Sequence, residues 1–135
     1  MASILDIEGV GENYADKLKA IGIVSTDALL EKGCTAKGRA EITEKSAIGA
    51  KLILRWVKHS DLFRVKGVAG QYAELLEAAG VNSVVELSKC KADILYEALA
   101  KCNVEKKVVR APPSQDKVIR WVAQAKALPD RKSVV

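Results

Sequence analysis

The chain has 135 residues, of which 49% are hydrophobic and 29% charged, a balance typical of a globular protein rather than of a disordered tail. Its apolar runs are shorter than the roughly 18–20 residues that a membrane-spanning helix needs, and its first residues lack the basic segment and apolar core of a signal peptide. The formal net charge is +5, and the basic residues gather in two stretches, 32–58 and 101–135. Such a balance permits contact with nucleic acid or with an acidic surface without demanding it.

Three cysteines without Cys-x-x-Cys spacing, Cys34, Cys90 and Cys102, indicate free thiols, buried or half-buried, in a reducing compartment. We therefore expect a cytoplasmic protein without a structural zinc site. No Walker loop or dinucleotide fingerprint is present either, so we expect no metal, no cofactor and no small-molecule substrate.

The chain repeats itself internally. Residues 7–30 match residues 65–88 at an offset of 58, with nine identical pairs in 24 positions, where chance would give roughly one or two. Arg55-Trp56-Val57 returns as Arg120-Trp121-Val122 at an offset of 65, so the second copy carries about seven extra residues, best placed around 109–113. We predict two units, 1–60 and 61–135, that pack into one compact body because each alone would have a thin core.

Each copy is predicted to be helical. The first helix of each copy carries a Tyr-Ala pair and apolar residues at helical spacing, and Gly22 and Gly80 are placed to end it. Ser25 and Ser83 follow as N-caps, the latter with Glu86 in a capping box. The helices around Trp56 and Trp121 come last, the second capped by Ser114. Only 81–85 and 104–109 contain short pieces that could be strands, so we predict an all-α protein.

The chemistry rests on the turns before the first helix of each copy. Gly9-Val10-Gly11, followed by Tyr14-Ala15 and Leu18, fits a helix-hairpin-helix pattern. Its glycines permit a tight turn that leaves backbone N–H groups at the start of the next helix, where they can receive a phosphate oxygen. Copy two has Gly67-Val68-Ala69 at the same place, and a degenerate version lies at 46–49.

These segments resemble those of a prokaryotic tandem helix-hairpin-helix family, related to sterile-alpha-motif-like helical domains and catalogued as a domain of unknown function (four-three-three-two). The resemblance covers nearly the whole chain. It is carried by the following stretches: 6–11 with Tyr14-Ala15, 37–39, 54–57, 61–68, 75–81, 85–87 and 121–129. It implies an internally duplicated fold with pseudo-twofold symmetry and no established activity. Ala69 departs from the second Gly-apolar-Gly turn, and 46–49 departs from the family pattern, which puts phosphate binding at those two turns in doubt.

Basic side chains could extend a phosphate-binding surface. They follow the helix faces and the approach to the second hairpin: Lys51, Arg55, Lys58, Arg64, Lys66, Lys117 and Arg120. The alternative is that these rows are ordinary solvated surface, and that the hairpins serve only to pack helices. Four acids around the first hairpin favour that alternative: Asp6, Glu8, Glu12 and Asp16.

Other conspicuous residues have structural interpretations. Trp56 and Trp121 fall on apolar helix faces and are expected in the core rather than against bases. His59, the single histidine, is expected on the surface at a helix end. Its neighbours Ser60 and Asp61 cannot form a catalytic triad with it, because three adjacent residues cannot adopt that geometry.

We therefore expect a non-enzymatic, sequence-independent nucleic-acid-binding module. It would contact the DNA or RNA backbone through the hairpin N–H groups of Gly9, Val10, Gly11, Gly67, Val68 and Ala69, together with the basic side chains named above. The alternative is a protein–protein interaction or scaffold module, which would use the acidic first hairpin or an exposed apolar patch. We expect no membrane partner.

Overall fold

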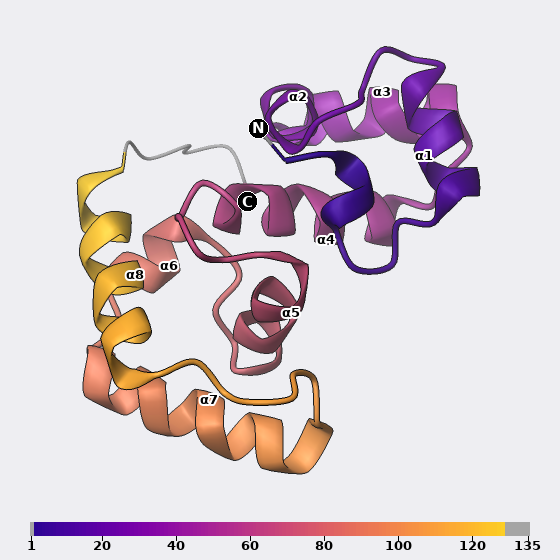
Figure 1. Cartoon of the computed structure of the whole chain (residues 1–135). Helices are drawn as coiled ribbons and strands as arrows, with labels where there is room; N and C mark the ends of the chain where they lie inside the picture. Colours follow the sequence, from indigo (N-terminus) through magenta and orange to yellow (C-terminus); the bar gives the residue numbers. More distant parts are fainter. Residues whose placement is uncertain (1, 129–135) are drawn as a thin grey trace. The chain divides into compact units, whose positions relative to one another are not determined.

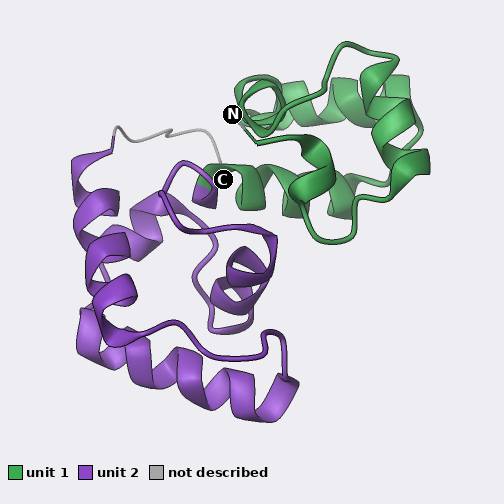
Figure 2. Ribbon diagram, viewed as in Figure 1, with its two compact units in different colours: residues 1–61, 131–135 green, residues 62–130 purple. Residues whose placement is uncertain are grey.

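The computed structural model describes residues 2–128, and its helices form two compact units that meet between residues 61 and 62 (Figure 2). The described part of unit 1 is 2–61 and that of unit 2 is 62–128. The predicted boundary falls one residue earlier, between 60 and 61. The second predicted repeat also includes 129–135, which lie outside the described residues. Packing of both units into one compact body stays a prediction.

Unit 1 contains a short 3-10 helix and four α-helices (Figure 1): η1 (Ile4–Asp6), α1 (Glu12–Lys19), α2 (Thr26–Gly33), α3 (Ala36–Ser46) and α4 (Ala50–Leu62). As predicted, α1 is followed by a glycine at positive φ, Gly22 at 86°, which lets the Ile23 N–H bond back to the Leu18 carbonyl at 2.9 Å. Ser25 then caps α2 by accepting from the Ala28 N–H at 3.1 Å. Gly22 and Ser25 therefore mark the end of α1 and the start of α2, as the sequence predicted.

Unit 2 contains four further helices: α5 (Gly70–Ala78), α6 (Val84–Ser88), α7 (Ala92–Lys106) and α8 (Gln115–Ala127). Helix α8 packs against α6 and α7, and α5 packs against α7. Gly80, at a φ of 90°, and Ser83 repeat the roles of Gly22 and Ser25. The predicted capping box is modified, because the Glu86 carboxylate accepts from the N–H of Asn82 at 2.9 Å.

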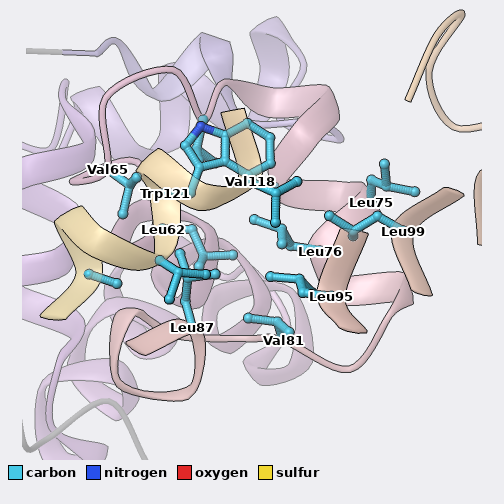
Figure 3. Close-up of a cluster of buried hydrophobic side chains, with 14 of the residues drawn as sticks. Leu62, Val65, Leu75, Leu76, Val81, Leu87, Leu95, Leu99, Val118 and Trp121 are labelled. Atoms are coloured by element: carbon cyan, nitrogen blue, oxygen red, sulfur yellow. The ribbon is translucent and has the colours of Figure 1, made fainter. Parts of the chain in front are cut away.

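A continuous apolar core fills unit 2 and brings together residues far apart in the sequence (Figure 3). It begins with Leu62, the last residue of α4, and includes Leu76, Leu87, Leu99 and Trp121. These side chains are at most 2% exposed. Burial of five large apolar side chains, at about 1.5–3 kcal/mol each, supplies much of the drive to fold this unit.

The prediction of an all-α protein is confirmed for residues 2–128, where the structure has helices and one isolated bridge between Ser3 and Ser25. The ambiguous pieces 81–85 and 104–109 form helix ends and connecting turns rather than strands. None of the helices in this part of the chain is long and apolar enough to cross a membrane.

Candidate nucleic-acid interface

The first hairpin joins η1 to α1. Gly9 has a φ of 92°, a conformation that disfavours any residue with a Cβ. Val10 is buried between the two exposed glycines, and its N–H bonds back to the carbonyl of Ile7 at 3.1 Å. The buried valine anchors the turn, so that Gly11 stands at the exposed start of α1.

The second hairpin has the same backbone. Gly67 has a φ of 90°, Val68 is buried, and the Val68 N–H bonds to the carbonyl of Val65 at 3.2 Å. Ala69 starts α5 at a φ of −104°, and Gly11 starts α1 at −86°. Both values are ordinary for any residue, so the turn needs only its first glycine and Ala69 does not disturb it.

A buried indole lies next to the left-handed glycine of each hairpin. A Cβ added to Gly9 would lie 3.7 Å from Nε1 of Trp56, and one added to Gly67 would lie 3.1 Å from Nε1 of Trp121. The predicted core positions of both tryptophans are confirmed by exposures of 0% and 2%. Each indole also meets a tyrosine of the helix after the hairpin, edge to face. The ring centroids are 5.1 Å apart for Tyr14–Trp56 and 5.2 Å for Tyr72–Trp121.

The helices after the hairpins start without a side-chain cap. Gly11 and Ala69 offer no side-chain acceptor to the first N–H groups of α1 and α5. By contrast, a hydroxyl caps each of α2, α3, α6 and α8; these are Ser25, Thr35, Ser83 and Ser114. Helix α7 also lacks a side-chain cap, at Lys91. The first N–H groups of the hairpin helices therefore receive no bond from an N-cap side chain, and they stand where an external acceptor can take them.

The charges at the two hairpins are opposite in sign. Around the first hairpin, Asp6, Glu12 and Asp16 are exposed and Glu8 is half-buried. The first turn of α5 has no acid, and the second hairpin is preceded by the half-buried Arg64 and the exposed Lys66. An anion approaching the second hairpin is therefore attracted where one approaching the first is repelled.

Two side chains of α8 reach the second hairpin. The Gln124 amide holds the backbone of Lys66, with its Oε1 accepting from the Lys66 N–H at 2.9 Å and its Nε2 donating to the Lys66 carbonyl at 3.3 Å. Lys117 lies over the ring of Tyr72, with its Nζ 5.3 Å from the ring centroid. Since Tyr72 lies in the first turn of α5, the structure brings a second cation to the start of that helix. Lys17 lies in the same way over Tyr14 of α1, with its Nζ 5.8 Å from the ring centroid, so the two hairpins differ in their acids and in Lys66 rather than in this cation. Sequence reasoning missed this role of Gln124.

The remaining predicted basic residues are more dispersed. On α4, Lys51 is exposed while Arg55 and Lys58 are half-buried. Arg120 is exposed on α8. A track joining the α4 row to the α8 row stays a prediction.

The degenerate turn at 46–49 joins α3 to α4. Ala47 has a φ of 60°, and the buried Ser46 hydroxyl donates to the Ile42 carbonyl at 2.6 Å and accepts from the Ile48 N–H at 3.2 Å. Ser46 thus stabilises the turn internally.

The prediction for His59 is wrong. His59 is 1% exposed, and Ser60 and Asp61 are buried with it. Helix α4 runs on past His59 to Leu62, so the histidine does not stand at an exposed helix end. The Ser60 hydroxyl donates to the Trp56 carbonyl at 2.8 Å.

The cysteines are half-buried and free, as predicted. Burial raises the pKa of the Cys90 thiol, and the nearby Glu86 carboxylate raises it further. Within residues 2–128 no group of three or more His, Cys, Asp or Glu side chains is arranged to hold a metal ion.

Comparison with known proteins yields one family. A family model described as "Domain of unknown function (DUF4332)" matches residues 8–128. No curated protein and no solved structure matches the chain significantly.

Proposed function

The chain belongs to the DUF4332 family, and we propose that it is a non-enzymatic module that binds the nucleic-acid backbone without reading sequence. The observation that carries the proposal is the second hairpin, where an uncapped helix start coincides with two cations, Lys66 and Lys117, and with no acid in the first turn.

The proposal includes a tandem architecture of two helix-hairpin-helix units that arose by internal duplication. Three likenesses support it: a glycine near φ 90° in each hairpin, a buried valine after it, and a tyrosine–tryptophan pair with nearly equal spacing. Sterile-alpha-motif-like pseudo-symmetry belongs to the same proposal.

Phosphate is the ligand that this chemistry favours. Free N–H groups at a helix start and the positive end of the helix dipole attract an anion of phosphate size. Lys66 and Lys117 add point charges on flexible stems, which suit a backbone whose phosphates recur at regular spacing but carry no base identity. Such contacts give affinity that falls steeply with salt.

The test is fluorescence anisotropy with labelled single-stranded DNA, duplex DNA and RNA, titrated across salt. For duplex DNA, log K should fall linearly with log salt, with a slope of about −0.9 for each neutralised phosphate. Lys66→Gln combined with Lys117→Gln should make that slope shallower by about 1.8. The matched control, Lys37→Gln with Lys45→Gln, removes the same charge from exposed positions on α3 and should leave the slope nearly unchanged.

Absence of binding to all three nucleic acids at about 50 mM salt, where backbone contacts are strong, would overturn the proposal.

A protein partner is the second candidate, and one feature of unit 1 favours it. Leu5 and Val24, each 54% exposed, line one hollow of about 280 Å³ together with Asp16 and Lys19. Exposed apolar side chains beside the acidic first hairpin would suit a partner with apolar and basic residues. Pull-down with wild-type protein and with Leu5→Asp tests this candidate: a partner lost on the substitution supports it, and a partner retained counts against it.

A further inference from the structure

Unit 2 has a groove beside its hairpin helix that the proposed function does not use. It has a volume of about 780 Å³ and is lined by residues of the start of α5 and the end of α7 and by the turn that follows α7. The segment 107–114 leads from α7 to α8 (Figure 1). We call this groove the Lys107 groove. Its principal lining residues are Gln71, Asn103, Val104, Lys107, Val108 and Arg110.

The lining of the Lys107 groove is basic and partly apolar. Lys107 and Arg110 are both exposed, and no carboxylate lines the groove. Val104 is 77% exposed, a large apolar surface left in water next to the two cations. The groove therefore offers both an anion site and an apolar contact.

Asn103 fixes the shape of the groove. Its buried side-chain oxygen accepts from the Val109 N–H at 2.9 Å, and its backbone carbonyl accepts from the Lys107 N–H at 2.8 Å. These bonds hold the turn from Lys107 to Val109 against the end of α7. Lys107 begins this turn and Arg110 directly follows it, so both cations project from next to an ordered backbone, which lowers the entropy cost of binding.

Unit 1 has no counterpart to this segment. Its α3 and α4 are joined by 47–49, whereas α7 and α8 are joined by 107–114. The residue that follows α3 and the residue that follows α7 are both left-handed although neither is glycine. Ala47 has a φ of 60° and Lys107 a φ of 51°. Unit 2 therefore keeps the same strained turn and adds charge and length to it.

We propose that the Lys107 groove binds one unpaired nucleotide of a single-stranded nucleic acid, with a phosphate on Lys107 and Arg110 and the base against Val104. This inference rests on the proposed function, since the strand is the one whose backbone would lie on the second hairpin. The two sites are adjacent because Gln71 stands in the first turn of α5, directly after the hairpin.

Two considerations select a single strand over a duplex. The volume lies within the range of roughly 300–1,000 Å³ typical of sites for small organic ligands, which is suited to one nucleotide and not to a double helix. A base can leave its stack to enter a groove at small cost only where it is unpaired. The exposed Val104 side chain and the two cations then meet the two halves of the nucleotide.

The test compares a labelled single-stranded oligonucleotide with its blunt duplex in anisotropy titrations of the full chain. Lys107→Gly removes the side chain and places glycine where a left-handed residue is needed, so the fold should be kept or stabilised. Ala47→Gly is the matched control, because it relieves the same backbone in unit 1 without removing a charge.

We expect Lys107→Gly and Arg110→Gln each to weaken single-strand binding by about two- to fivefold. Each should also make its salt slope shallower by about 0.7. Val104→Ser should weaken single-strand binding with the slope unchanged, since it removes an apolar contact and no charge. Duplex binding should change little in all three groove variants. The control Ala47→Gly should change neither single-strand binding nor duplex binding.

The outcomes separate the two proposals. If no nucleic acid binds, the proposed function fails and this inference with it. If duplex and single strand bind equally, and the groove substitutions leave both unchanged, the groove inference alone is overturned. A mononucleotide that competes with the single strand only when Lys107 and Arg110 are present would place the site at the groove itself.

Discussion

The two hairpins share one backbone conformation but differ in the sign of the net charge around them. The comparison therefore separates the residues that form the turn from the residues that would bind a phosphate. A left-handed glycine, a buried valine and an indole beneath recur in both. The first hairpin has four acids and one nearby cation, Lys17. The second has Lys66 and Lys117, and its nearest acid on α5, Glu74, follows the first turn. Packing thus constrains the turn residues and leaves the surface free to change. If charge decides phosphate binding, only the second hairpin binds.

Removal of the Trp121 indole should have the largest effect on the free energy of unfolding. Trp121→Ala would empty a buried site beneath Gly67 and remove the edge contact with Tyr72, at a cost of about 3–5 kcal/mol in the free energy of unfolding. Urea denaturation followed by circular dichroism measures it. Trp121→Phe, which refills part of the space, should recover a substantial share. A loss below about 1 kcal/mol for Trp121→Ala would show that the hairpin does not depend on its indole.

Substitutions of the hairpin glycines should have the next largest effect on stability. Their stability losses show which turn positions require glycine. Gly67→Ala and Gly9→Ala place a Cβ at a φ near 90° and should each cost about 1–2 kcal/mol or more. Gly67→Ala should cost the more, because its methyl would meet the Trp121 indole at 3.1 Å rather than 3.7 Å. Gly11→Ala is the control and should be nearly neutral, since Ala69 occupies the matching position. Thermal unfolding ranks the three variants, and equal losses at Gly11 and Gly67 would contradict the account.

The smallest expected effect is the pH dependence of stability that comes from the Cys90 thiol, which lies in unit 2. Burial and the Glu86 charge raise the pKa of this thiol, so the folded state favours the neutral form. That contribution to stability is present below the pKa of an unfolded cysteine, about 8.5, and is lost as the pH rises through the folded value. Alkylation by iodoacetamide, followed peptide by peptide in mass spectrometry, should give a midpoint above the ordinary cysteine value. Glu86→Gln should lower that midpoint, and a wild-type midpoint at or below the ordinary value would refute the shift.

Local structure was largely predictable because it depends on neighbours in the chain. Gly22 and Gly80 marked helix ends and Ser25 marked a helix start, since a left-handed glycine and a hydroxyl acceptor act within a few residues. The tryptophans were predicted to be buried from helical spacing alone. These features need no knowledge of what lies across the fold.

The site residues were less predictable because they depend on contacts between distant segments. The bond from Gln124 to Lys66 spans 58 positions, and His59 is buried although it was expected on the surface at a helix end. Residues 104–109 could have been a strand in the sequence, whereas they form the end of α7 and the turn that lines the Lys107 groove.

The central claim is that a phosphate backbone sits on the free N–H groups of the second hairpin and not on those of the first. The most direct test is a ¹⁵N–¹H correlation spectrum of the full chain, titrated with a short DNA duplex at low salt. We expect the amides of Ala69, Gly70 and Gln71 to shift progressively, while those of Gly11, Glu12 and Asn13 stay in place. Shifts confined to the first hairpin, or absent from both, would contradict the account.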